Sequence, residues 1–455
     1  MARLRFPRAR LPLTAVSVLL LLALPAWQLQ RQPRPRAQGL ERVLALADLI
    51  QSFSSSPGAP VPPLWRERLG VPLAERLWRA QRGSWWQLWS RNGEGQAVLV
   101  LPAATLAAVP PRQLPPQRLT VDDLLLVAPD PLTRHWLAEQ TRSRPRQPRG
   151  LERSCLQRLA QGQAVFWRPS AVAAIAGPLA PLLQRFQEGC VDLRLGGAAL
   201  QWRGEAASSA GVLAEALGSS TPAAAPPAPA AALPPQVWLE LEGSSLDLVL
   251  EALLGRQLIR EPLASRYGFG PAQLQLLRQA PFRLRVLALP QGPFQASLEL
   301  QLAVGNDRAA WIRILTALRQ ALEEQGLQAA PSPGVAPLPT ATWTRDDGAV
   351  VGGWRWVTVR GGAPELQFFL GPPPRTAQAE AAVSPAIRTG APAAAPVQLD
   401  LRLRPQELER RGLLPPGLPE VIRKASRLEA SAEAGRSGRV PDPVSRLTGR
   451  LDLNP

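Results

Sequence analysis

Histidine, cysteine and lysine are scarce in this chain of 455 residues. It contains one histidine, two cysteines and a single lysine, Lys424. One histidine cannot build a multi-histidine metal site, and two cysteines exclude both a disulfide-dense scaffold and a multi-cysteine cluster. Lys424 sits in Ile-Arg-Lys-Ala, so the glycine-rich phosphate loop that ends in Gly-Lys is also absent. We therefore predict no metal site and no cofactor.

Nucleophile motifs are missing as well. The sequence has no Ser-x-x-Lys and no Gly-x-Ser-x-Gly, and a Ser-His-Asp triad would need His135, which lies on an expected helix. Asp122-Asp123 and Asp346-Asp347 are the only aspartate pairs, and neighbours on a strand point to opposite faces. We predict no catalytic residue. An enzyme that assembles distant Asp and Glu residues stays as the alternative.

Positive charge dominates the sequence. Lys+Arg number 52 against 35 Asp+Glu, which gives a formal net charge of +17 and favours anionic partners. Much of the excess lies before residue 37 and in residues 142–153. The latter segment suggests contact with an anionic surface through Arg142, Arg144, Arg146, Arg149 and Arg153. A solvated loop is the simpler interpretation, and direct binding of nucleic acid is disfavoured because no known nucleic-acid motif is present.

An apolar stretch near the start predicts a membrane span from Leu11 to Leu29. It carries no charged residue, and four arginines precede it. At about 1.5 Å per residue, a helix of this length nearly crosses a hydrocarbon core of roughly 30 Å. Leu24-Pro25-Ala26 is a poor cleavage site, so we favour an uncleaved anchor over a signal peptide. The arginine distribution predicts a cytoplasmic N-terminus, with the bulk of the chain on the periplasmic or lumenal side.

Export would allow Cys155 and Cys190 to pair. Extracytoplasmic compartments permit disulfides, and closing a loop of this size would stabilise the fold by about 4 kcal/mol in the chain-entropy model. Two buried free thiols are the alternative.

A strand, a helix and a β-hairpin recur three times along the chain. The first strands are expected at 164–167, 237–241 and 397–403. The hairpins are expected at 191–204, 282–304 and 426–453. The hairpin strands alternate apolar and polar residues, which is typical of a sheet whose two faces are packed differently. The fold class is therefore α+β, with a single N-terminal transmembrane helix followed by antiparallel sheets packed by helices.

Two further regions resemble each other. A hairpin at 83–102 with a strand at 124–128 is similar to the segment 343–356 with a strand at 365–370. The apolar spacing also predicts helices over 40–53 and 64–82. Proline- and alanine-rich stretches mark linkers. The predicted units are 1–36 (anchor), 37–217 (α+β domain), 218–236 (linker), 237–327 (α+β repeat unit), 328–340 (linker) and 341–455 (α+β domain related to 83–205).

Tryptophan is frequent, with 14 residues. The groups Trp85, Trp86 and Trp89, or Trp354 and Trp356, would suit stacking on sugars or bases. We favour core packing, since Trp354 and Trp356 share one face of a strand.

The anchor, the repeated units and the closing Arg446-Leu447-Thr448-Gly449-Arg450-Leu451-Asp452-Leu453 strand resemble a group of cyanobacterial membrane-anchored proteins of unknown function. This resemblance in layout implies no active-site residue. We expect a single-pass, non-enzymatic envelope protein. It would act as an interaction or scaffold module with a protein partner, or carry an apolar ligand in a groove between helix and sheet. An extracytoplasmic enzyme of carbohydrate or envelope metabolism is the alternative.

Overall fold

The computed structural model describes residues 36–90, 96–106, 109–143, 147–176, 183, 186–207, 232–254, 256–290, 295–305, 307–330, 338–359, 363–372, 397–415, 417–434 and 444–453. The predicted span Leu11 to Leu29 and the residues Arg144 and Arg146 lie outside these ranges, as does most of the predicted linker 218–236. None of the helices described is long and apolar enough to cross a membrane.

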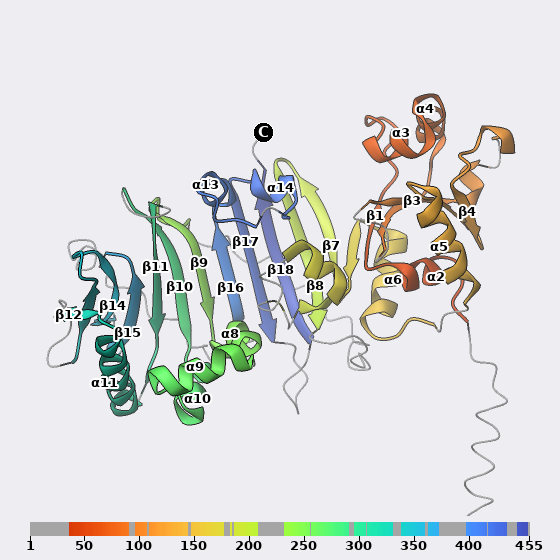
Figure 1. Ribbon diagram of the computed structural model, residues 1–455. Helices are drawn as coiled ribbons and strands as arrows, with labels where there is room; N and C mark the ends of the chain where they lie inside the picture. Colours follow the sequence, from red (N-terminus) through yellow and green to blue (C-terminus); the bar gives the residue numbers. More distant parts are fainter. Residues whose placement is uncertain are drawn as a thin grey trace, which may run out of the picture.

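One continuous antiparallel sheet organises the described chain (Figure 1). Its hydrogen-bonded ladders give the order β4 (Arg118–Val121), β5 (Leu124–Val127), β3 (Val98–Pro102), β2 (Trp85–Trp89), β1 (Leu49–Phe53), β6 (Ala164–Trp167), β7 (Glu188–Gly196), β8 (Ala199–Ala207), β18 (Val444–Asp452), β17 (Arg427–Ala434), β16 (Val397–Leu403), β9 (Val237–Gly243), β10 (Phe282–Ala288), β11 (Ala296–Leu302), β15 (Glu365–Leu370), β14 (Val350–Val357), β13 (Ala341–Thr344) and β12 (Gln328–Ala330). The predicted α+β class, with antiparallel strands packed by helices, is confirmed.

Five three-stranded meanders account for most of this order. They are β1–β2–β3, β6–β7–β8, β9–β10–β11, β13–β14–β15 and β16–β17–β18. Neighbouring meanders meet alternately through their first strands (β1 with β6, β16 with β9) and through their last strands (β8 with β18, β11 with β15). The predicted strand–helix–hairpin unit therefore occurs a fourth time, at β1 to β3.

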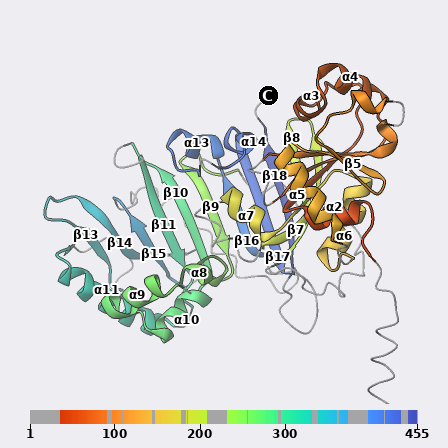
Figure 2. The ribbon, with the colours of Figure 1, turned by 45° about the vertical axis from the view of Figure 1, so that its right-hand side comes forward.

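The last meander of the chain lies in the middle of the sheet (Figures 1 and 2). Strand β18 pairs with β8 over nine residues, from Val444–Ala207 to Asp452–Ala199. On the other side, β16 pairs with β9. Residues 397–453 therefore join residues 36–207 and 237–372 into a single sheet, and the sheet is complete only when the end of the chain is in place.

Helices cover the sheet in several groups. They are α2 (Leu40–Leu46), α3 (Pro63–Leu69), α4 (Val71–Ala80), α5 (Pro131–Arg142), α6 (Leu151–Gln161), α7 (Pro169–Ala176), α8 (Asp247–Leu254), α9 (Gln257–Tyr267), α10 (Pro271–Gln279), α11 (Arg308–Glu324), α13 (Pro405–Arg410) and α14 (Glu420–Arg423). The helices α8 to α11 lie together near one end of the strands β9 to β15, and α3 and α4 lie at the opposite end of the molecule (Figure 1).

Two predicted helices need correction. The helix expected over 40–53 ends at Leu46, and Leu49–Phe53 form strand β1 between β2 and β6. Ladder hydrogen bonds on both sides outweigh the local helical spacing there. The helix expected over 64–82 is two helices, since Gly70 between α3 and α4 has φ 77°, a left-handed value that glycine adopts without strain.

The N-terminal part of the sheet is apolar on both faces. One face packs on α2, α5 and α6 through Trp86, Leu88, Val100 and their neighbours. The other packs on α3 and α4, where Trp65 and Trp78 meet Trp85 edge to face. Trp85 and Trp86 therefore lie in the core, as favoured above, whereas Trp89 is half-buried.

Candidate functional site: an apolar groove beside α11

A cavity of about 320 Å³ lies between helix α11 and the strands β11, β13, β14 and β15. Its lining is formed by Leu298, Leu300, Leu318, Leu322, Leu327, Trp343, Val351, Gly352, Gly353, Trp354, Phe368, Phe369 and Leu370. We call this cavity the α11 groove. Its volume lies at the low end of the range of ~300–1,000 Å³ typical of small-molecule sites.

The strand register places side chains in rows along the floor of the groove. Leu298 pairs with Leu370, Leu370 with Gly352, and Gly352 with Trp343. In an antiparallel sheet, directly opposed residues point to the same face. The adjacent row on that face contains Leu300, Phe368 and Trp354. Four strands therefore contribute to one apolar surface.

Helix α11 packs tightly at its start and loosely toward its end. Trp311, Ile314 and Leu315 are buried in its first turns. Leu318 and Leu322, one turn apart on the same face, are only half-buried although they face the sheet. The groove exists because the second half of the helix leaves the strands incompletely covered.

Strand β14 has glycine at two positions that leave no room for a Cβ atom, Gly352 and Gly353. A Cβ atom at Gly352 would lie 2.4 Å from the carbonyl oxygen of Phe369, and one at Gly353 would lie 2.2 Å from the carbonyl oxygen of Ala341. Such distances are well inside van der Waals contact, so β14 requires glycine at both positions. Gly352 lies between Leu370 and Trp343 in the same row and lines the groove with its backbone.

Two indole N–H groups at the groove are unsatisfied. Trp343 and Trp354 are each 3% exposed, and their ring centroids lie 5.5 Å apart with the planes tilted by 50°. Within the described residues, neither Nε1 atom has a hydrogen-bond acceptor. Buried donors are normally paired, but both Nε1 atoms are enclosed by neighbouring protein atoms and are not exposed in the groove.

The mouth of the groove is apolar and uncharged. Val351 is 39% exposed and Leu370 57% exposed, so both present hydrophobic surface to solvent at the edge of the cavity. No ionisable residue is among the lining side chains. The ion pair of Arg319 and Glu323 on α11, at 2.9 Å, lies on the exposed side of the helix. The surroundings therefore favour a neutral, apolar occupant.

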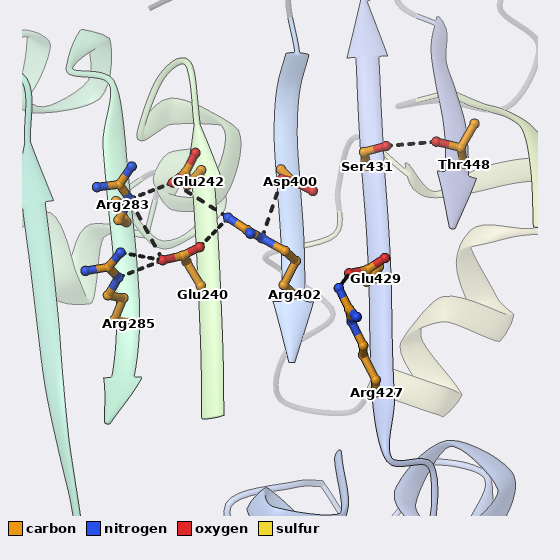
Figure 3. Close-up of polar contacts among 10 residues, drawn as sticks. All are labelled: Glu240, Glu242, Arg283, Arg285, Asp400, Arg402, Arg427, Glu429, Ser431 and Thr448. Carbon is orange, nitrogen blue, oxygen red and sulfur yellow. Dashed lines mark hydrogen bonds and ion pairs between the residues drawn. The ribbon is translucent and has the colours of Figure 1, made fainter. Parts of the chain in front are cut away.

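The opposite face of the central strands carries a ladder of buried charges (Figure 3). Arg283 pairs with Glu242 at 2.6 Å, Arg285 with Glu240 at 2.7 Å, and Arg402 bridges back to Glu240 from β16. Ser431 and Thr448 continue the row by a 2.8 Å hydrogen bond. Each of these Glu carboxylates is paired with arginine, so neither is a free general acid or base.

Glu299 is a buried carboxyl whose pKa departs from its ordinary value. Burial raises its pKa, while Arg285, Arg355 and a hydrogen bond from Gln367 partly oppose the rise. A raised carboxyl pKa is one requirement of the alternative enzyme. A cleft with converging carboxylates is the other, and Glu299 lines neither the α11 groove nor a larger, polar cavity of about 600 Å³ beside α2 and α6, where Glu41 is the one carboxylate.

The residues singled out by sequence lie away from the groove. Cys155 of α6 and Cys190 of β7 form a disulfide and are fully buried, with Cα atoms 5.7 Å apart. Arg142, Arg149 and Arg153 are exposed around the connection between α5 and α6, and none of them forms an ion pair within the described chain. In the same ranges, no group of His, Cys, Asp and Glu could hold a metal ion.

The sequence patterns did not predict α11, the helix that covers the groove. No helix was expected over residues 308–324, and β12 falls in the predicted linker 328–340. The spacing of Trp311, Leu315, Leu318 and Leu322 is the signal that would have predicted α11. Comparison with protein-family models, curated proteins and solved structures finds no match to this chain, and the layout resemblance noted above stays a prediction.

Proposed function

We propose that this chain is a membrane-anchored, non-enzymatic envelope protein that carries a small apolar molecule in the α11 groove. The observation that carries the proposal is the cavity itself. It has about 320 Å³ of space, a lining without any ionisable side chain, and exposed hydrophobic residues at its mouth. A concave apolar site of this size suits a small ligand better than a protein surface, so the carrier is favoured over the scaffold.

The disulfide supports a location outside the cytoplasm. Disulfides such as Cys155–Cys190 persist in oxidising compartments and are rare in the cytosol of most cells. The anchor at Leu11 to Leu29 would then tether the chain, with its folded part on the periplasmic or lumenal side. Protease treatment of intact cells or spheroplasts tests this arrangement. Protection of the folded part in spheroplasts that are sealed would count against it.

Photolabelling tests the carrier function. The full-length chain is reconstituted in lipid nanodiscs, because detergent would compete for an apolar site, and is labelled with an alkane that bears a diazirine. We expect the label on α11 and β15, near Leu318, Leu322 and Phe368. Leu322→Trp fills the groove and should abolish this labelling.

Thr316→Trp is the matched control, since residue 316 lies on the exposed side of the same helix. It should leave the labelling unchanged. Label spread evenly over the surface, or groove labelling that persists in Leu322→Trp, would refute the carrier proposal.

A further inference from the structure

The apolar face of the central strands continues from the α11 groove across the sheet. We propose that the molecule carried is a membrane lipid, and that its acyl chain extends from the groove along a strip of half-buried side chains on β11, β10, β9, β16 and β17. This apolar strip consists of Leu298, Leu300, Leu284, Val286, Leu239, Leu241, Leu401, Leu428 and Ala430. The inference rests on the proposed function, because the strip begins at the α11 groove.

The strand register aligns these side chains in two rows. The first row starts at Phe368 in the groove and continues by direct pairing through Leu300, Leu284, Leu241, Leu401 and Ala430. The second row contains Leu298, Val286, Leu239, Leu403 and Leu428. Directly opposed residues of an antiparallel sheet point to the same face. Both rows therefore lie on the face that carries the groove, and neither contains an ionisable residue.

The apolar strip lies between two groups of helices that do not close over it. Leu241 and Leu284 are at the margin of the core formed with α8, α10 and α11. Leu401 and Leu428 are at the margin of a separate core formed with α13. All four side chains are half-buried and keep contact with solvent. In Figure 1, none of the described helices crosses the middle of β9, β10 and β16.

The dimensions suit an acyl chain. The groove, at about 320 Å³, is small for a whole membrane lipid. The first row adds a length of about 24 Å between β15 and β17, because neighbouring strands lie about 4.8 Å apart. Two leaflets of acyl chains form a hydrocarbon core of roughly 30 Å, so the chains of one leaflet span about half of that. One acyl chain can therefore lie along the strip with its end in the groove.

An acyl chain fits this surface better than a protein partner. A specific protein interface buries about 800 Å² on each partner and is held partly by hydrogen bonds. The strip offers only apolar side chains that are already half-buried between helices. An acyl chain needs no hydrogen bond and gains free energy for every methylene that it buries. The headgroup would stay in water, since no ionisable side chain lines the groove or the strip to pair with it.

A photoreactive phospholipid tests the apolar strip. The full-length chain is placed in nanodiscs that contain a phosphatidylcholine with a diazirine on its acyl chain, and labelled residues are located by mass spectrometry. In the wild type we expect label in the α11 groove and on the strip, near Leu241, Leu401 and Ala430. This distribution is measured without any variant, so the proposal stays testable if a substitution in the strip prevents folding.

Leu241→Trp places a large ring in the middle of the strip. Label beyond it, on β16 and β17, should fall by about tenfold, as expected if about two methylenes lose their contacts. Label in the groove should remain. Leu258→Trp is the matched control, because Leu258 is 89% exposed on α9 and lies outside the strip. It should leave both sets of labels unchanged.

The outcomes distinguish the acyl-chain proposal from the carrier itself. Lipid label confined to the groove, or label on β16 and β17 that persists in folded Leu241→Trp, would overturn the acyl-chain proposal, while groove labelling by the alkane would still support the carrier. An unlabelled strip at which Leu241→Trp breaks up a dimer would be a protein interface, which also overturns the proposal. Absence of groove labelling by the alkane would overturn the carrier.

Discussion

At one end of the sheet, β2, β3 and β5 lie between two layers of helices, with α3 and α4 on one face and α2, α5 and α6 on the other. At the other end, β13, β14 and β15 have apolar packing on the face that α11 covers, and the other face carries Arg355 and Gln367. Both triplets are antiparallel in the same order along the chain. The two ends differ in the helices that pack on them, and this packing determines whether a cavity remains.

Tryptophan shows the same difference. In the N-terminal region, Trp65 meets Trp78 and Trp85 at interplanar angles of 81° and 88°, so ring edges face π surfaces and the space is filled. At the other end of the sheet, the ring planes of Trp343 and Trp354 are tilted by 50° to each other and border the groove. One cluster is a closed core, and the other borders a cavity.

The largest expected effect tests this contrast directly. Trp65→Ala should reduce the free energy of unfolding by about 5 kcal/mol, because it empties a closed core. Trp343→Ala should cost less, since it enlarges a space that a ligand can fill. Urea unfolding of the two variants, with and without the photoreactive alkane, measures both. An equal cost for the two, unaffected by the ligand, would contradict the distinction.

The disulfide provides a second test, since it lies in the N-terminal region only. Replacing Cys155 and Cys190 by Ala together should destabilise by about 4 kcal/mol in the chain-entropy model, for a sequence separation of 35 residues. The α11 groove should label as before under native conditions. Loss of groove labelling in the folded double variant would show that the two regions are coupled more strongly than their separate cores suggest.

Much of the sheet could be predicted from sequence. The alternation in residues 296–302 and the turn at Asp346-Asp347-Gly348 predict a hairpin strand and a hairpin turn that the structure contains, with Gly348 at φ 76°. These features depend on neighbouring residues, whose preferences are local. The order of the meanders depends on contacts between residues far apart in the chain, such as Ala199 and Asp452, which no local pattern records.

The groove was harder to predict for the same reason. Leu318 and Leu322 have the spacing of any core-facing helix, and only the strands beneath them show that they are half-covered. The prediction of a helix at residues 49–53 was wrong because the two strands that pair with β1, namely β2 and β6, come later in the chain. A cavity forms where packed helices and strands leave space unfilled. Sequence periodicity indicates only which residues of one helix or strand lie on the same face, so it does not predict a cavity.

The smallest expected effect concerns pH and distinguishes the two regions by charge. Strands β2, β3 and β5 contain no ionisable residue, whereas Glu299 is buried in β11 with a raised pKa. The folded state holds this proton more tightly than the unfolded state. The contribution of protonated Glu299 to stability is therefore complete below the ordinary pKa of 4.5 and is lost as the pH rises toward the folded pKa.

Stability measured by urea unfolding should therefore decline over that pH range in the wild type, and Glu299→Gln should remove part of the decline. Glu323→Gln, on the exposed side of α11, is the control and should leave the decline intact. If the stability of Glu299→Gln equals that of the wild type at every pH, the buried carboxyl is not the source of the decline. The polar face at this end of the sheet would then be as insensitive to pH as the apolar strands β2, β3 and β5 at the other end.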